Sequence, residues 1–247
     1  MSGYRPEELL ISVIARLLAG TRHVAMGVAS PIPGSAALLA RDQNGGSPRV
    51  SILGSPRHTF WSDGGKELFD CAAQGRIDAF FLSGAQIDGQ ANVNLVGIGD
   101  GYPQQKLRFS GSFGSAFLYF TVPRVILFRP DHDPRVLVEK VDFISAPGVS
   151  DKGVHRPGGP YALVTGKALF LFDRAKGRFR LESVHPGVTV DEIVANTGFD
   201  FDRPAQVPTT PAPDAATLAQ IRGPIGREIA EAYPQFAADI LGVRTAA

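Results

Sequence analysis

Apolar residues in the first half of the chain alternate between helical spacing and short continuous runs. The spacing of Leu10, Ile14 and Leu17 predicts a first helix. It is expected to begin near Pro6 and to end at Gly20. Further helices are expected at residues 35–41 and 66–74. Continuous apolar runs predict buried strands at residues 23–29, 49–53 and 77–82. Strands that alternate with helices in this way indicate an α/β fold with an open, mostly parallel sheet and helices on both faces.

The second half of the chain is richer in expected strands. They are predicted at residues 124–129, 136–144, 162–173 and 178–184, and the last two form a β-hairpin. The segment from Thr189 to Glu192 has the pattern of a capping box and predicts a helix that runs to Ala195. Short helices follow a proline-rich crossing and are expected at residues 215–222 and, interrupted at Pro234, 227–241. We interpret the crossing as a surface segment and expect residues 1–247 to form a single domain with a hairpin-rich C-terminal part.

The balance of charges limits the classes of partner. Lys and Arg number 25 and Asp and Glu number 24, which gives a net charge of +1. A chain so balanced has no long-range field that would hold nucleic acid or an anionic membrane surface. No apolar run approaches the roughly 20 residues that cross a bilayer, and the first residues lack the basic and apolar regions of a signal peptide. We therefore expect a cytoplasmic protein that binds neither nucleic acid nor membrane.

The sequence contains no self-contained catalytic motif. The single cysteine, Cys71, excludes a disulfide framework and a multi-thiolate metal site, and we interpret it as a small core residue. None of the five histidines lies four residues from another, so no metal is expected. Neither a Gly-x-Ser-x-Gly turn nor a phosphate-binding P-loop is present. The chemistry must therefore come from other patterns.

One polar segment follows the strand expected at residues 77–82. Three carboxamides and a carboxylate gather there, on Gln86, Asp88, Asn92 and Asn94. Ligands in an open parallel sheet lie beyond the carboxyl ends of the strands, so these four side chains are candidates for substrate binding. The alternative is that they hydrogen-bond to nearby backbone and orient turns.

A second segment is rich in glycine and precedes an apolar stretch at residues 116–122. Its central residues are Gly111, Ser112, Phe113 and Gly114. A glycine-rich turn that leads into a helix directs backbone N–H groups toward an anion or a developing oxyanion. The alternative is a tight turn that requires positive φ. Arg124 follows, and its guanidinium either pairs with a carboxylate through two parallel hydrogen bonds or lies on the surface at the start of a strand.

Several short segments, taken together and in order, resemble the β subunit of the family I CoA-transferases of the glutaconate type. They are GAQID (84–88), NVN (92–94), FSGSFG (109–114), VDFISAPG (141–148), LVT (163–165), FLFD (170–173), HPGVT (185–189) and NTGF (196–199). The likeness covers nearly the whole chain. It implies a fold of the CoA-transferase type, a homologous α subunit in an αβ or α₂β₂ complex, an active site between the subunits and an acyl-CoA substrate. Coenzyme A is then part of the substrate, and no separate cofactor is implied.

The sequence departs from this family pattern at two places. The transferases have a glutamate after their second strand that attacks the thioester, whereas Leu53 or Gly54 stands there in this chain. Phe113 stands where the transferases have consecutive glycines. Both departures resemble one branch of the family, the β subunit of a steroid ring-opening hydrolase of cholesterol catabolism, whose catalytic glutamate belongs to the α subunit. An arginine of the β chain contributes to the pocket in that branch, and Arg124 matches its position.

The resemblance to this branch implies a CoA-thioester hydrolase that opens the last steroid ring by carbon–carbon bond hydrolysis of the retro-Claisen type. Arg124 would be catalytic, by pairing with a substrate carboxylate or the developing enolate. Backbone N–H groups at residues 111–114 would hold charge near the substrate. Two alternatives stay open. One is a CoA-transferase β subunit that moves CoA between carboxylic acids with a nucleophile from elsewhere, and the other is a non-catalytic scaffold for an active α subunit.

Overall fold

A computed structural model of the protein describes residues 3–59, 61–99 and 101–243. The chain divides into two compact units. The first unit comprises Met1–Phe81 and Pro211–Ala247, and the second comprises Leu82–Thr210. No helix in the described ranges is long and apolar enough to span a membrane. The expectation that residues 1–247 form a single domain stays a prediction.

The first unit is built on three short parallel strands. They are β1 (His23–Met26), β2 (Arg49–Ile52) and β3 (Ala79–Leu82), the last of which ends at the first residue of the second unit. Strand β1 pairs in parallel with both others, with Val24 opposite Val50 and Ala79. The helical segments of this unit are α1 (Pro6–Leu17), α2 (Pro31–Gln43), α3 (Gly64–Ala73), α6 (Ala215–Gln220), a π-helical turn (Ile221–Ile225), α7 (Gly226–Ile229) and α8 (Pro234–Asp239).

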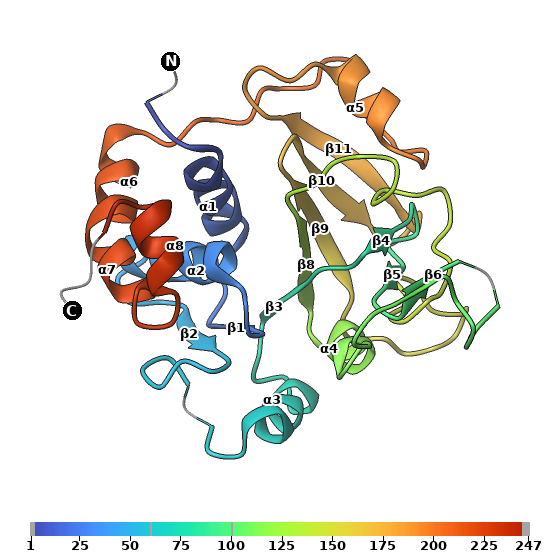
Figure 1. The fold of residues 1–247 in the computed structure, drawn as a ribbon, viewed down its shortest axis with the longest axis horizontal. Helices are drawn as coiled ribbons and strands as arrows, with labels where there is room; N and C mark the ends of the chain where they lie inside the picture. Colours follow the sequence, from blue (N-terminus) through green and yellow to red (C-terminus); the bar gives the residue numbers. More distant parts are fainter. Residues whose placement is uncertain (1–2, 60, 100, 244–247) are drawn as a thin grey trace. The chain divides into compact units, whose positions relative to one another are not determined.

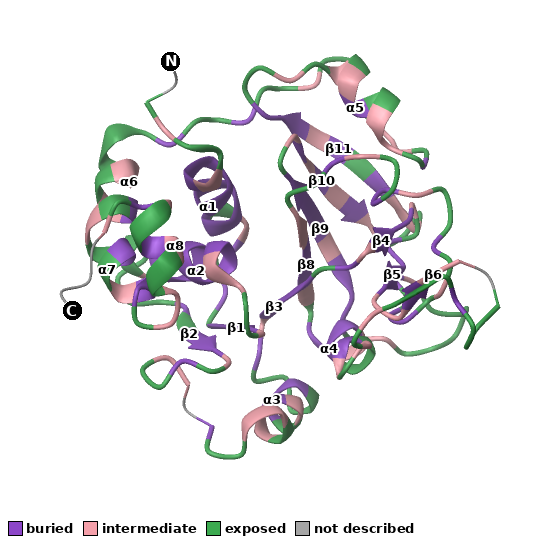
Figure 2. Cartoon of the chain, viewed as in Figure 1, coloured by how far each residue is buried: buried purple, intermediate pink, exposed green. Residues whose placement is uncertain are grey.

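The core of the first unit lies where α1 and α2 pack against each other (Figure 1). Their fully buried apolar residues include Ile11, Ile14, Leu38 and Leu39, and Figure 2 shows both helices buried along most of their length. Helix α2 begins at Pro31, four residues before the helix expected at residues 35–41. The fixed φ of proline suits the first helical turn, where a missing N–H costs nothing.

The second unit contains four longer strands. They are β8 (Arg124–Arg129), β9 (Pro160–Thr165), β10 (Ala168–Asp173) and β11 (Arg178–Val184). Strand β8 runs parallel to β9, whereas β9, β10 and β11 are successively antiparallel. Two small hairpins, β4 (Gln86–Ile87) with β5 (Val93–Asn94) and β6 (Gly97–Ile98) with β7 (Leu107–Arg108), were not predicted. The helices of this unit are α4 (Ser115–Thr121) and α5 (Val190–Asn196).

Most expected elements of the second unit are confirmed. Strands β10 and β11 form the predicted hairpin, and Thr189 caps α5 by accepting a hydrogen bond from Glu192 N. The single strand expected at residues 162–173 is instead two strands, because the chain turns at Gly166. A Cβ at Gly166 would lie 2.6 Å from Pro130 O, so only glycine fits this turn.

The strand expected at residues 136–144 is wrong, because this segment forms no ladder. Its backbone pairs one residue at a time, with Val138 N donating to Ile87 O and Asp142 N donating to the side chain of Gln86. Its apolar residues Val136, Leu137 and Val141 are buried without belonging to a sheet. The predicted fold class is nevertheless confirmed, as an α/β fold with a mixed, mostly parallel sheet that includes the β10–β11 hairpin.

Candidate functional site

The turns that follow β1 and β2 form an exposed edge of the first unit. Leu53 N donates to Met26 O, which continues the pairing of the two strands by one residue. Gly54 is exposed at φ +90°, and Val28 is 64% exposed. Ligands of α/β folds lie beyond the carboxyl ends of parallel strands, so this edge is a candidate site. No carboxylate belongs to Leu53 or Gly54 themselves, as the sequence indicates.

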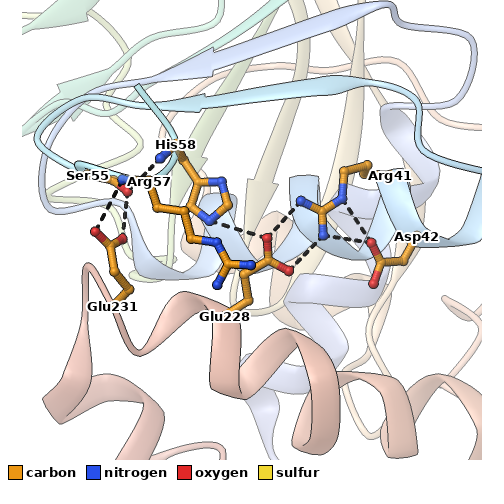
Figure 3. A network of polar contacts seen from close by, with 7 residues as sticks. All are labelled: Arg41, Asp42, Ser55, Arg57, His58, Glu228 and Glu231. Atoms are coloured by element: carbon orange, nitrogen blue, oxygen red, sulfur yellow. Dashed lines mark hydrogen bonds and ion pairs between the residues drawn. The ribbon is translucent and has the colours of Figure 1, made fainter. Parts of the chain in front are cut away.

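A carboxylate from a distant part of the sequence lies on this turn. Ser55 Oγ, which is buried, donates to Glu231 Oε2 at 2.6 Å, and Arg57 N donates to Glu231 Oε1 at 3.4 Å. Figure 3 shows Glu231 beside Ser55, with the carboxylate directed at the turn. Glu231 is exposed, so its oxygens stay accessible. Glu231 is not among the predicted site residues, because no sequence pattern connects Ser55 to a residue 176 positions away.

The segment that carries Glu231 is held by a second group of charges. Arg41 of α2 donates to both oxygens of Glu228, at 2.8 and 2.7 Å, and also binds Asp42 (Figure 3). These hydrogen bonds lower the pKa of Glu228 and raise that of Arg41. His58 Nε2 lies 3.3 Å from Glu228 Oε1 without hydrogen-bond geometry, and burial lowers the pKa of His58. The ion pair therefore fixes α7, from which the chain runs on to Glu231.

The predicted polar residues Asp88 and Asn92 bond to each other and to nearby backbone. Asp88 Oδ1 accepts from Gln90 N and Asn92 N, and its Oδ2 accepts from Asn92 Nδ2. Asn92 Oδ1 accepts from Gly148 N. Both side chains are buried. They also line an open cavity of about 680 Å³, together with Glu139, Lys140, Ile144 and Phe199 among others.

Gln86 and Asn94 form a second buried set. Asn94 Nδ2 donates to Gln86 Oε1 and to Gly97 O, both at 2.7 Å. Asn94 Oδ1 accepts from Val96 N and Gly97 N, and Gln86 Oε1 also accepts from Asp142 N. These bonds match the turn-orienting alternative. Substrate binding by the four polar side chains between positions 86 and 94 stays a prediction.

The glycine-rich segment leads into a helix as expected. Gly111 has φ +106°, Gly114 immediately precedes α4, and Ser112 O accepts from Ser115 N. Phe113 is 88% exposed and has φ +49°, a conformation that a bulky residue seldom adopts. The Phe113 ring therefore faces outward from the turn. An oxyanion-binding role for Gly111, Ser112, Phe113 and Gly114 stays a prediction.

Arg124 is the first residue of β8 and is half-buried. Its guanidinium lies over the ring of Tyr161, 4.8 Å from the ring centre. A cavity of about 550 Å³ lies past the other end of β8, where Arg129 and Asp131 line it with Ser83, Leu95, Ile98 and Phe109. Arg124 is not among the residues that line this cavity. Its catalytic role stays a prediction.

Comparisons with known proteins agree on the family. The family model for coenzyme A transferases matches residues 5–196. The chain is 31% identical to the β subunit of the 3-oxoadipate CoA-transferase of Pseudomonas knackmussii, over 90% of this chain and 94% of that protein. It is 36% identical to the β subunit of the glutaconate CoA-transferase of Acidaminococcus fermentans, over 58% of this chain and 54% of that protein. The crystal structure of the latter enzyme superposes with a TM-score of 0.78 at 25% identity, over 90% and 95% of the two chains.

The steroid ring-opening branch is a more distant match. The cholesterol ring-cleaving hydrolase IpdB subunit of Rhodococcus jostii is 28% identical, over 64% of this chain and 62% of that protein. The expectation that this branch is nearest is therefore corrected, because both transferase subunits show higher identity. The chain belongs to the coenzyme A transferase family, as a β subunit.

Proposed function

We propose that this chain is the β subunit of a heteromeric enzyme that moves CoA between carboxylic acids, acting with an α subunit on an acyl-CoA. The similarity to a transferase β subunit over nine-tenths of the chain carries the proposal. The 3-oxoadipate and glutaconate relatives suggest a dicarboxylic acid as one substrate. Whether the complex is αβ or α₂β₂ stays a prediction, as does the cytoplasmic location.

The proposal needs a carboxylate, and Glu231 supplies one at the turn after β2. Its oxygen would attack the thioester carbonyl of the donor, so that the C–S bond breaks and an acyl–glutamyl anhydride forms with release of CoA thiolate. The thiolate would then attack the glutamyl carbonyl and release the donor acid as a carboxylate. The resulting glutamyl-CoA thioester would pass CoA to the acceptor carboxylate by the reverse of these two steps. The hydrogen bonds from Ser55 and Arg57 would hold the carboxylate in place.

The test uses the full-length chain co-purified with its α subunit. A donor acyl-CoA and a set of dicarboxylates are incubated with the complex, and new acyl-CoA products are followed by mass spectrometry. Hydroxylamine would trap the glutamyl-CoA thioester as a hydroxamate on the peptide that contains Glu231. Glu231→Gln, which keeps the size of the side chain and one oxygen that can accept a hydrogen bond, is expected to abolish transfer. Asp70→Asn, which removes an exposed carboxylate of α3, is expected to retain it. Transfer at the wild-type rate in Glu231→Gln would exclude Glu231 as the nucleophile.

A second candidate function is the steroid ring-opening hydrolase. The absence of a carboxylate at Leu53 and Gly54 favours it, since the catalytic glutamate would then belong to the α subunit. Backbone N–H groups of residues 111–114 and the guanidinium of Arg124 would then face the substrate. The same assay separates the two functions. Hydrolytic ring cleavage of a cyclic acyl-CoA without any transfer would favour the hydrolase, and full activity of the α subunit paired with Arg124 variants would favour a scaffold.

A further inference from the structure

Two arginines of the second unit lie close together, the half-buried Arg156 and the exposed Arg174. None of the ion pairs among the residues that the structure describes involves Arg156 or Arg174. Burial lowers the pKa of both guanidinium groups, although arginine stays protonated at neutral pH. Two positive charges held close together repel each other unless an anion compensates them.

The two guanidinium groups converge on one glycine. A Cβ at Gly159 would lie 3.3 Å from Arg174 Nη2 and 3.4 Å from Arg156 Nε. Gly159 has φ +146°, and its N–H donates to Val122 O, which fixes the backbone beneath the two side chains. The absence of a side chain at Gly159 therefore leaves room for both arginines to approach the same point.

Backbone carbonyls and aromatic rings hold these arginines in place. Arg156 donates to Tyr119 O at 3.0 Å and to Gly158 O at 3.1 Å, and its guanidinium lies 5.2 Å from the ring centre of Tyr119. Arg174 donates to Pro123 O at 2.7 Å through Nη2, and none of the hydrogen bonds found in the described part of the chain uses its Nη1. Carbonyl oxygens orient the groups but neutralise neither charge. Donors on both side chains remain available to a ligand.

A cavity of about 210 Å³ lies against both arginines. Its other walls include Ser150, Val149, Val154, Pro160 and Phe172. Ser150 Oγ lies 3.4 Å from Arg156 Nη1 and can donate its own proton to an oxygen acceptor. Apolar walls strengthen the field of two like charges, and a cavity lined by one sign of charge attracts a counter-ion.

We propose that the cavity lined by Arg156 and Arg174 binds an oxyanion of the phosphate class. Two planar guanidinium groups and a hydroxyl match the several acceptor oxygens of a tetrahedral anion. The ligand is either inorganic phosphate or a phosphoryl group of CoA. The second source rests on the proposed function, whereas the first does not.

The test is isothermal titration of inorganic phosphate into the full-length chain co-purified with its α subunit, in a buffer free of other oxyanions. Saturable binding is expected for the wild type, with affinity at least tenfold lower in Arg174→Gln and in Arg156→Lys. Glutamine at position 174 keeps an N–H at the place of Arg174 Nε, which donates to Pro160 O, and lysine at position 156 keeps the charge but loses the planar fork. Arg135→Gln, which changes an arginine with a 91% exposed side chain in the same unit, is the matched control and is expected to bind like the wild type.

A second measurement needs no variant. Phosphate is expected to slow the modification of Arg156 and Arg174 by phenylglyoxal, read by mass spectrometry, and to leave Arg135 unaffected. Displacement of phosphate by CoA but not by dephospho-CoA would assign the site to the 3′-phosphate, displacement by both would assign it to the pyrophosphate, and displacement by neither would assign it to free phosphate. The proposal is overturned if the complex shows no saturable phosphate binding, as it would if a carboxylate of the α subunit occupies the cavity, or if Arg174→Gln binds as tightly as the wild type. Loss of CoA transfer with phosphate binding intact would refute the proposed function alone.

Discussion

Asn94→Leu is expected to destabilise the protein by about 3 kcal/mol, because it leaves buried hydrogen-bonding groups without partners. Leucine has the same branching and the same number of side-chain heavy atoms as asparagine, so the substitution leaves no cavity. The substitution removes four bonds of a side chain that is fully buried. Two of the groups left behind keep another donor, because Gln86 Oε1 still accepts from Asp142 N and Gly97 O from Gln105 Nε2.

The other two groups lose the partner that Asn94 Oδ1 provides. They are the N–H groups of Val96 and Gly97, and a buried donor left unsatisfied costs about 1 to 3 kcal/mol. Asn196→Leu is the matched control, because half-buried Asn196 donates one bond, to Glu192 O, and its loss is expected to cost about 1 kcal/mol or less.

Urea unfolding followed by circular dichroism measures both variants, and hydrogen exchange at Val96 and Gly97 locates the effect. An Asn94→Leu protein within about 1 kcal/mol of the wild type would refute the reasoning, since a single unsatisfied donor already costs that much. It would show that these bonds contribute little to stability, and it would strengthen the interpretation of Asn94 as a residue kept for binding substrate.

Two further predictions concern Arg124 and His132. Arg124→Ala is expected to lower kcat/KM of the complex about 100-fold, on the scale of one lost charge-assisted contact in the transition state, and Arg124→Lys is expected to recover part of it. Steady-state rates within about threefold of the wild type would instead give Arg124 a structural role, such as the contact of its guanidinium with the ring of Tyr161. Burial lowers the pKa of His132, which bonds Thr165 and Thr197, to about 4. Because this folded-state pKa lies below the unfolded value near 6.5, the unfolded chain binds the proton first. Stability should fall by about 3 kcal/mol as the pH drops from 6.5 to 4, and His132→Gln should flatten this part of the pH profile of urea unfolding; an unchanged profile would contradict the burial argument.

The sequence predicted the elements whose signal is local. Apolar runs identified strands β1, β2, β3 and β8, and the capping pattern at Thr189 identified α5. The strand predicted at residues 136–144 is wrong because apolar residues are typical both of strands in a sheet and of other buried segments. Several of its apolar side chains are buried, but its backbone bonds to a neighbouring hairpin and to side chains instead of a second strand. Periodicity cannot separate these two ways of burying a chain.

The candidate site was only partly predictable, for a related reason. Polar residues near one another in sequence were found, but most of them bond to one another. Glu231 was identified by its contacts with residues far along the chain. Arg156 and Arg174 were identified because neither has an acidic partner in the described part of the chain. Ser55 lies 176 residues from Glu231, and Arg174 donates to Pro123 O across 51 residues. Such contacts depend on the fold and produce no spacing pattern that could be recognised in the sequence.

The proposed role of Glu231 implies that a catalytic group can move in sequence while its place in the fold is kept. The reaction requires that the nucleophile is held in position to reach the thioester, and different segments of the chain can carry it. Leu53 and Gly54 carry no carboxylate. The hydroxyl of Ser55 and the N–H of Arg57 nevertheless bind the carboxylate of Glu231, from the segment after α7. That segment is itself fixed by the bidentate pair of Arg41 and Glu228, whose oxygens are not free for catalysis. The two glutamates therefore have different surroundings. Glu228 is paired with Arg41 and mostly buried, whereas Glu231, the proposed nucleophile, is exposed and bound by a hydroxyl and a backbone N–H.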